Sequence, residues 1–267
     1  MLVCSLGDLL LDVIVRLDAP IAADTDTDAH TYVGAGGQAA NVAAWVVALG
    51  DRARFLGKRA HDAAGRTVAD ELRALGVELA GPAVEAGTGT VVSLAQADGT
   101  RSMLSDRGVA TTFAPSELDE AWLEGCDWLH LPAYSLAREP LRSTALAAAR
   151  VVPRVSVDLS STAAIDEMGR ETLLSLLDEV RPALVLASEA EAGLVGPVEA
   201  DTVVVHAASG CVVRDRGGEH AHAAVPAEVV DGTGAGDAFA AGFLLGGYEV
   251  ALRAAARCIA QMGAMPR

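Results

Sequence analysis

The sequence predicts a three-layer α/β/α domain, in which helices cover a largely parallel central sheet and a small β lid is attached. After residue 115, short apolar runs alternate regularly with helical segments, which is typical of parallel strands joined by crossover helices. The 267 residues are 51% hydrophobic but only 4% aromatic, which suits helices of small aliphatic residues packed on a buried sheet. Residues 87–106 instead alternate between apolar and polar side chains, as strands of a separate small sheet would.

The first half of the chain supplies the first strands, two helices and the lid. Strands are expected at 2–7, 9–17 and 53–57, an exposed loop or edge strand at 20–33, and helices at 38–49 and 63–75. A glycine directly follows each of these helices, as is common where a helix ends. The Asp98-Gly99 pair between two β-rich runs predicts a hairpin. We therefore expect the lid to come from about 12–33 and 86–106.

The second half of the chain supplies the α/β alternation. Strands are expected at 127–131, 154–158, 183–187 and 202–206, and helices at 140–150, 167–178, 188–195, 237–246 and 249–262. The sequence contains no internal repeat, low-complexity tract or interdomain linker. One domain over residues 1–267 is therefore expected, long enough to bury a sizeable core.

The charge balance restricts the partners of this chain. The formal net charge is −16 at pH 7, which argues against nucleic acid and against an anionic membrane surface. A small phosphorylated ligand is still compatible, because backbone amides and a metal ion can supply a local positive field. We therefore expect a small-molecule ligand and no nucleic-acid or membrane partner.

The N-terminus and the cysteines predict a cytoplasmic protein. The apolar run at residues 1–15 lacks a basic leader and contains Asp8 and Asp12, so it resembles a strand more than a signal peptide. No run approaches the ~18 apolar residues of a membrane-spanning helix. The four cysteines are far apart and form no CxxC pair, so neither a zinc site nor a disulfide framework is expected.

Residues 231–237 read DGTGAGD and precede the helical pattern AFAAGFLLG. Small residues let the backbone turn tightly, so that successive N–H groups and the positive end of the helix dipole can bind an anion. Asp237, at the start of this helix, is placed to accept a proton from an attacking hydroxyl group. The alternative is a helix that is merely capped by an aspartate after a flexible turn.

Residues 232–244 (GTGAGDAFAAGFL) resemble the second signature of the ribokinase-like PfkB family of carbohydrate kinases. The sequence departs from that signature in having Gly232 where threonine is usual. The resemblance implies Asp237 as the catalytic base, the amides of Gly234, Ala235 and Gly236 as an anion hole, and Asp231 as part of a site for a monovalent cation such as K⁺.

Residues 36–41 (GGQAAN) resemble the first signature of the same family, GG-x-x-x-N. The resemblance implies that Gly36 and Gly37 let a substrate approach the backbone and that the Asn41 amide binds two of its hydroxyls. Residues 34–39 also match G-x-G-x-x-A, a weak dinucleotide-binding pattern, which leaves an NAD(P)-binding enzyme as a distant alternative.

Two aspartates within the first apolar run are candidates for substrate binding. Buried carboxylates are costly unless hydrogen-bond donors pair with them, and sugar hydroxyls are such donors. The family resemblance implies that Asp12 binds the substrate, and Asp8 stands where Asn, Asp or Ser is common. A solvated sheet edge is the alternative for both. Arg107, after the second lid strand, could pair with a carboxylate or phosphate of the substrate, or with Asp106 or another acid at the surface.

The nucleotide side carries weaker matches. Ser188 and Glu191 resemble the family's N-x-x-E stretch, which organises Mg²⁺, although Ser188 replaces the usual asparagine. The pair is also a helix capping box, and both roles are compatible. Residues 206–211 lack the first glycine of a G-x-x-G nucleotide loop and look one residue short. Ser209, Gly210 and Thr233 are the nucleotide contacts that the resemblance implies there.

We therefore expect an ATP- and Mg²⁺-dependent kinase that phosphorylates a hydroxyl of a sugar or sugar acid. It has no P-loop lysine, because no Walker A motif is present and Lys58 is the only lysine. Kinases of this family often pair their lids, so a homodimer through the lid is expected. A nucleoside kinase of the same family is the main alternative, and a kinase-like binding protein without activity is another. A nucleoside base favours aromatic stacking partners, and the candidates in this sequence are Tyr32, Phe113 and Tyr134.

Overall fold

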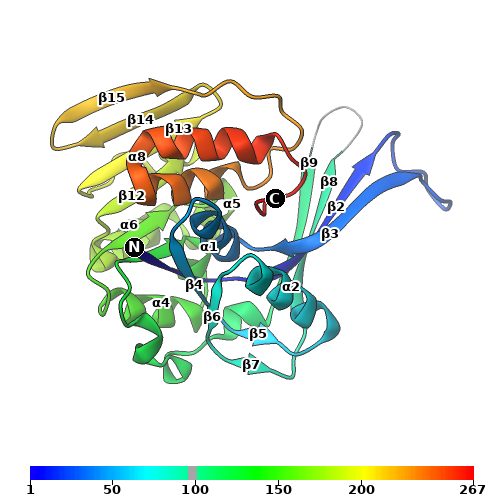
Figure 1. Ribbon diagram of the computed structural model, residues 1–267, viewed down its shortest axis with the longest axis horizontal. Coiled ribbons are helices and arrows are strands. Elements are labelled where there is room, and N and C mark those ends of the chain that lie inside the picture. The colour runs from blue at the N-terminus through cyan, green and yellow to red at the C-terminus, as the bar shows by residue number, and fades with distance from the viewer. Residues whose placement is uncertain (96–100) are drawn as a thin grey trace.

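The computed structural model describes residues 1–95 and 101–267, and helices cover a large twisted sheet in it (Figure 1). Within these residues the central sheet has nine strands in the order β15-β14-β13-β12-β11-β10-β1-β4-β6. They are β1 (Leu2–Leu6), β4 (Arg52–Leu56), β6 (Glu78–Ala80), β10 (Trp128–Pro132), β11 (Val155–Asp158), β12 (Leu184–Ser188), β13 (Thr202–Ala207), β14 (Gly210–Asp215) and β15 (Gly218–Ala223). All neighbours from β13 to β6 pair in parallel, which confirms the largely parallel sheet.

Helices cover both faces of this sheet and complete the three layers (Figure 1). One face carries α1 (Gln38–Ala48), α2 (Ala63–Ala74) and α8 (Ala235–Ile259), and the other carries α3 (Tyr134–Ala137), α4 (Leu141–Ala149), α5 (Thr162–Met168), α6 (Arg170–Val180) and α7 (Glu189–Val195). Trp45 and Phe55 are buried on the first face, and Phe113 and Leu173 on the second. Burial of each such side chain contributes about 1.5–3 kcal/mol, so two apolar cores hold the layers together.

Glycines interrupt the helical segments at two places. The helix expected at 167–178 is two helices, because Gly169 adopts φ 77° and separates α5 from α6. A positive φ lies outside the right-handed helical region, so a continuous helix ends there. The two helices expected at 237–246 and 249–262 are confirmed as the two halves of α8, because Gly246 and Gly247 adopt non-helical conformations and form a kink between them.

The edge of the central sheet contains an antiparallel hairpin that the sequence pattern did not predict. β13, β14 and β15 pair antiparallel, and Ala207 lies opposite Gly210, so two residues form the turn between β13 and β14. This tight turn explains why the 206–211 loop looks one residue short. Three short 3₁₀ helices, at Val109–Thr112, Pro115–Glu117 and Glu120–Leu123, lie in the described chain between β9 and β10.

A second sheet stands beside the central one (Figure 1). Among the described residues it has four strands in the order β3-β2-β8-β9, which are β2 (Leu10–Leu17), β3 (Ala29–Gly36), β8 (Thr88–Ala95) and β9 (Arg101–Gly108). β8 and β9 pair antiparallel, but the expected Asp98-Gly99 turn lies outside the described residues. The segment expected as a loop or edge strand becomes a strand at Ala29 and forms one edge of this sheet. A further pair of short strands, β5 (Arg59–Ala60) and β7 (Ala83–Val84), is parallel.

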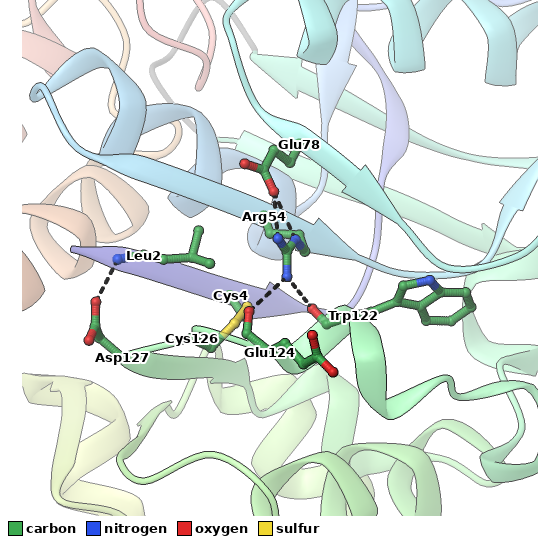
Figure 2. Close-up of a disulfide and its surroundings, with 8 residues drawn as sticks. All are labelled: Leu2, Cys4, Arg54, Glu78, Trp122, Glu124, Cys126 and Asp127. Atoms are coloured by element: carbon green, nitrogen blue, oxygen red, sulfur yellow. Dashed lines mark hydrogen bonds and ion pairs between the residues drawn. A yellow bond between two sulfur atoms is a disulfide. The ribbon is translucent and has the colours of Figure 1, made fainter.

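Cys4 and Cys126 are joined by a disulfide, which corrects the expectation that the cysteines stay unpaired (Figure 2). The two residues are 122 positions apart, but β1 pairs with β10, so the segment that precedes β10 lies beside β1. Their Cα atoms are 6.0 Å apart, a usual separation for a disulfide. The cysteines therefore no longer support a cytoplasmic location, which stays a prediction.

The surroundings of the disulfide tie neighbouring elements together (Figure 2). Arg54 on β4 pairs with Glu78 and donates to the carbonyl oxygens of Trp122 and Glu124. One arginine thus connects two strands with the segment that contains Cys126. No helix in the described part of the chain is both long and apolar enough to span a membrane.

Candidate active site

The candidate site lies where the chain passes between the two sheets. The chain leaves the central sheet at residues 7–9, returns to it at Gly37 and returns again after Gly108. These crossings meet beside the carboxyl ends of β1, β10 and β11, the edge of an α/β sheet at which ligands usually bind.

A cavity of about 300 Å³ opens at this meeting point, and we call it the acidic cavity. Its lining consists of Asp8, Leu10, Asp12, Gly37, Gln38, Asn41, Val91, Met103, Ser105, Arg107, Tyr134, Ser160 and residues 232–237. The structure thus brings together most of the residues that the sequence assigned to substrate binding and catalysis, although they come from four distant segments of the chain.

The glycine pair allows α1 to begin directly against the two aspartates. Gly37 adopts φ 97°, and a Cβ atom there would lie 2.6 Å from the carbonyl oxygen of Asp8. A Cβ atom on Gly36 would overlap the Asp12 carboxylate. A larger residue would therefore push the start of α1 away from Asp8 and Asp12.

Asn41 and Asp237 connect the two glycine-rich segments. Asn41 Nδ2 donates a hydrogen bond to Asp237 Oδ2 at 2.7 Å, and both residues are buried. They lie near the starts of α1 and α8, two helices that pack against each other. The resemblance implied two substrate hydroxyls for the Asn41 amide, but its nitrogen is engaged by Asp237, which leaves its oxygen for a ligand.

The environment of Asp237 favours its protonated form. Burial raises the pKa of Asp237 well above the ordinary aspartate value, and the charges of Asp158 and Asp8 raise it further. The hydrogen bond from Asn41 opposes this shift. A carboxylate destabilised in this way is a stronger base than an exposed one once it is ionised.

Arg107 forms an ion pair with Asp8 inside the acidic cavity. The Asp8 side chain is only 6% exposed and that of Arg107 only 18%, so solvent screens this pair weakly. The guanidinium group lies 3.6 Å from the centroid of the Tyr134 ring. The partner of Arg107 is therefore a buried acid, whereas Asp106 accepts a hydrogen bond from the Gly108 amide.

The turn before α8 requires a glycine at position 234. Gly234 is the N-cap of α8 with φ 78°, and a Cβ atom there would lie 2.5 Å from the Cβ of Ala264. Gly236, in contrast, lies within the first turn of α8 and has no positive φ. A Cβ atom on Gly236 would meet only His206, at 3.8 Å.

Asp231 holds this turn closed. Its Oδ1 accepts hydrogen bonds from the amide and the hydroxyl of Thr233, at 3.0 and 2.6 Å, and its Oδ2 accepts one from the Gly263 amide at 3.0 Å. Within residues 1–95 and 101–267, no group of three or more His, Cys, Asp or Glu is arranged to hold a metal ion. A monovalent cation at Asp231 stays a prediction.

A second cavity of about 620 Å³ lies on the other side of the glycine turn, and we call it the apolar cavity. Its lining consists of Ser188, His206, Ala207, Ala208, Gly210, Ala224, Val225, Pro226, Ala227, Val229, Gly232, Ala235, Gly236, Phe239, Leu252, Ala255, Ala256 and Ile259. Gly232, Ala235 and Gly236 line both cavities. The start of α8 is therefore the wall between them.

Ser188 and Glu191 form the capping box of α7. Ser188 Oγ accepts from the Glu191 amide at 3.3 Å, and Glu191 Oε2 accepts from the Ser188 amide at 2.8 Å. Burial raises the pKa of Glu191, and the charge of Asp158 adds to the shift. The capping role is thus confirmed, and a buried carboxylate remains beside the apolar cavity.

The structure places the other predicted nucleotide contacts around more than one cavity. Gly210 lines the apolar cavity, whereas Thr233 lines the acidic one. Ser209 lies in the turn after β13, where its carbonyl oxygen accepts from the Ala224 amide. Ser209 shares a further cavity of about 230 Å³ with Gly210 and Glu189, so Thr233 is the contact that lies apart from the other two.

Several residues of the site were not predicted. Asp158 ends β11, is fully enclosed, and has a pKa raised by burial to about 6. Gln38 Nε2 donates to Asp158 Oδ1 at 3.4 Å, and the Ser160 amide donates to the same atom at 2.7 Å. His206 lines the apolar cavity, and its ring packs against the ring of Phe239. A carboxylate at the end of a buried strand, as in RVSVD, was the signal that identifies Asp158.

Comparison with known proteins gives these cavities a context. The family model described as pfkB family carbohydrate kinase matches residues 1–258. The ATP-dependent ribose-1-phosphate kinase of Halopiger xanaduensis is 30% identical, over 96% of this chain and 90% of that protein. Fructokinase-1 of Oryza sativa is also 30% identical, over 91% of this chain and 82% of the relative.

The fold is shared with solved kinases. The crystal structure of adenosine kinase from Sinorhizobium meliloti superposes with a TM-score of 0.88 at 25% identity, covering 99% of this chain and 95% of that one. The ribokinase-like fold expected from the sequence is thereby confirmed.

Proposed function

Because this chain belongs to the pfkB family of carbohydrate kinases, which are phosphotransferases with an alcohol group as acceptor, we propose that it transfers the γ-phosphoryl group of ATP to a hydroxyl of a sugar or sugar acid, with Asp237 as the general base. The relatives are named for a sugar phosphate, a free sugar and a nucleoside, so their names do not select one acceptor.

The observation that carries this proposal is the wall shared by the two cavities. Backbone groups of Gly232, Ala235 and Gly236 border both spaces, and Asp237 faces the acidic one. A phosphoryl group passing from a donor in the apolar cavity to an acceptor in the acidic cavity would meet the start of α8. Helix N-termini stabilise the negative charge of such a group.

On the acceptor side, Asp12 and Asn41 would orient the sugar by accepting hydrogen bonds from its hydroxyls. Asp237 would take the proton from the attacking hydroxyl, and its raised pKa favours that transfer. Asn41, bound to Asp237 Oδ2, would keep the carboxylate in one orientation. The second sheet borders the cavity and would exclude water, which limits the hydrolysis of ATP.

On the donor side, the apolar cavity suits the nucleoside part of ATP, and the carboxylates of Glu191 and Asp158 fit a magnesium site. The charge of Asp158 raises the pKa of both Glu191 and Asp237, which indicates an excess of negative charge around these acids. Mg²⁺ is commonly held by one or two carboxylates, waters and substrate phosphates. When bound, the ion would neutralise charge on the phosphates.

The aromatic residues favour a sugar over a nucleoside acceptor. Phe113 is buried in the core, and Tyr32 lies against Gly263 and Arg267. Tyr134 does line the acidic cavity, but the Arg107 guanidinium covers its ring. Of these three rings, only Tyr134 lines the described acidic cavity, and Arg107 already stacks on it, which disfavours stacking of a base there.

The G-x-G-x-x-A pattern of residues 34–39 lacks the setting of a dinucleotide site. Gly34 and Gly36 belong to β3, an edge strand of the second sheet, and not to a strand of the central parallel sheet. Dinucleotide binding needs a parallel strand that turns directly into a helix. A family member without activity is not favoured either, since Asp237 is retained at the shared wall.

The test is ATP consumption against a panel of sugars, sugar acids and nucleosides, with NAD(P)H absorbance as a control. On the best acceptor, Asp237→Asn should lower turnover by about 10²–10⁴, the range for loss of a positioned base. It should keep the parent's thermal unfolding and its stabilisation by Mg-ATP. Asp178→Asn, at an exposed aspartate of α6, is the matched control. Acceptor-independent ATP consumption, or a variant within a few-fold of the parent, would contradict the proposal.

A further inference from the structure

Three side chains that line the acidic cavity each contain an oxygen atom with no hydrogen-bond partner within the described chain. These atoms are Asp8 Oδ1, Gln38 Oε1 and Asn41 Oδ1, and each is buried. The other polar atom of each side chain is already engaged, by Arg107, Asp158 and Asp237 respectively. A buried acceptor without a donor costs about 1–3 kcal/mol, so three of them around one cavity call for a ligand that donates hydrogen bonds.

The charges of the cavity oppose an anionic ligand. Asp8, Asp12 and Asp237 line it, and Arg107 is the one cationic side chain among the described lining residues. Arg107 is paired with Asp8 and stacked on Tyr134, so its charge and one of its faces are already used. The amides at the start of α8 are needed for the transferred phosphoryl group under the proposed function. No further positive charge in the described lining is left for a phosphate or carboxylate on the acceptor.

The second sheet contributes the apolar part of the cavity lining. Leu10 and Val91 are almost fully buried, and Met103 of β9 completes this side. Hydroxyl donors on one side and C–H groups on the other are the two surfaces of a sugar ring or an open polyol chain. Such a compound would satisfy the unpartnered oxygens without bringing a charge.

We infer that the acceptor is an uncharged polyhydroxyl compound, and that sugars already carrying a phosphate or a carboxylate are discriminated against. This rests on the proposed kinase function and narrows its acceptor from sugars and sugar acids to neutral ones. Asp8 is the residue that sets the discrimination, because its carboxylate neutralises Arg107 in the cavity.

The first experiment compares acceptors that share one carbon skeleton. Initial rates of ADP formation are measured with ribose, ribose 1-phosphate and ribonate, and with fructose and fructose 1-phosphate. The neutral member of at least one series should have a kcat/KM at least about tenfold above its anionic derivatives, since bringing like charges together costs several kcal/mol.

The second experiment changes the charge of the cavity. Asp8→Asn leaves Arg107 uncompensated, so the ratio of anionic to neutral acceptor kcat/KM should rise by at least about tenfold. Asp70→Asn is the matched control, because Asp70 pairs with Arg73 in the same way at the surface, where the ratio should not change. Thermal unfolding identifies a variant that fails to fold.

Arg107→Gln serves as the second variant and keeps the inference testable if Asp8→Asn is unstable. If Asp8 holds Arg107 and Arg107 does not bind the anionic group of the acceptor, the ratio of anionic to neutral acceptor kcat/KM should not rise in this variant. A parent enzyme that prefers an anionic acceptor, and loses that preference in Arg107→Gln, would overturn the inference but leave the kinase function intact. ATP consumption that no acceptor stimulates would overturn both.

Discussion

Asp237 is 6% exposed, and the charges of two other acids, Asp158 and Asp8, act on its carboxylate. Its pKa is raised by burial first and by Asp158 and Asp8 next. If the ionised form is the base, activity is low while Asp237 holds a proton and rises as pH passes its pKa. A catalytic aspartate with a raised pKa makes activity depend on pH in a range where an exposed aspartate would already be fully ionised.

We therefore expect kcat/KM to increase with pH through an apparent pKa above the ordinary aspartate range. In Asp158→Asn the increase should move to lower pH, because one of the charges that raise the pKa of Asp237 is removed. The measurement is kcat/KM from about pH 5 to 9 for the parent and the variant. A profile that is flat in both, or that does not move in the variant, would contradict the assignment.

Asp158 should also affect stability in a pH-dependent way. Burial raises its pKa in the folded protein to about 6, above the ordinary aspartate value of 3.8. Its contribution to stability is thus fully present below about pH 4 and is lost as pH rises through about 6, since the folded protein must then bury a charge. Asp158→Asn removes that cost and keeps an oxygen that can accept from the Ser160 amide.

At pH 8 the Asp158→Asn variant should therefore be more stable than the parent, by about 1–3 kcal/mol, and at pH 4 the two should be nearly equal. Urea unfolding at both pH values measures the difference. Lower stability of the variant at pH 8 would show that ionised Asp158 is favourably paired in the folded protein.

The start of α8 contains two glycines, Gly234 and Gly236, whose surroundings differ. At Gly234 the backbone itself requires glycine, because φ is 78° and Ala264 occupies the space of a side chain. At Gly236 neither constraint applies, because an added methyl group would only make an ordinary contact with His206, at 3.8 Å. The same substitution at these two sites therefore tests two different properties of the element.

Gly234→Ala should lower the free energy of unfolding by about 1–3 kcal/mol, from left-handed strain and the contact with Ala264. Gly236→Ala should leave stability unchanged or slightly higher, because alanine is the better helix former. It should nevertheless reduce turnover by narrowing the anion hole. Chemical unfolding and turnover are measured on both. Normal turnover in Gly236→Ala would argue against phosphoryl transfer beside residue 236.

The second sheet presents exposed apolar side chains that suit an interface. Val33 and Leu104, on its two edge strands, are 53% and 55% exposed. We expect a homodimer through this sheet, and Leu104→Glu should weaken association by at least about tenfold. Light scattering across a concentration series measures this, with Leu194→Glu, at an exposed leucine of α7, as the control. A parent that stays monomeric at every concentration would contradict the prediction.

Across the whole molecule, the features that the sequence predicts well are those that depend on residues close together in the chain. The parallel strands follow from short apolar runs between helices, and the start of α8 follows from the glycines before it. Asp12, Asn41 and Asp237 were found because each belongs to a short, specific motif. Their common position at one cavity follows from the topology of the sheets and not from any one segment.

The features that were missed depend on contacts between distant segments. Nothing near Cys4 in the sequence indicates Cys126, and the disulfide becomes evident only when β1 lies beside β10. Arg107 and Asp8 are 99 positions apart, so their pairing could not be distinguished from a surface ion pair. Asp158 belongs to no motif, and its importance arises from burial beside two other acids.

The wall shared by the two cavities has a consequence for how this protein can change. A substitution at Gly232, Ala235 or Gly236 changes both cavities at once. The specificity of one cavity therefore cannot be changed there without affecting the other. Residues such as Leu10 and Arg107 border only the acidic cavity. Under the proposed function, divergence toward a new acceptor, in evolution or by engineering, is therefore open along the second sheet and the chain crossings, while the start of α8 is constrained by both cavities.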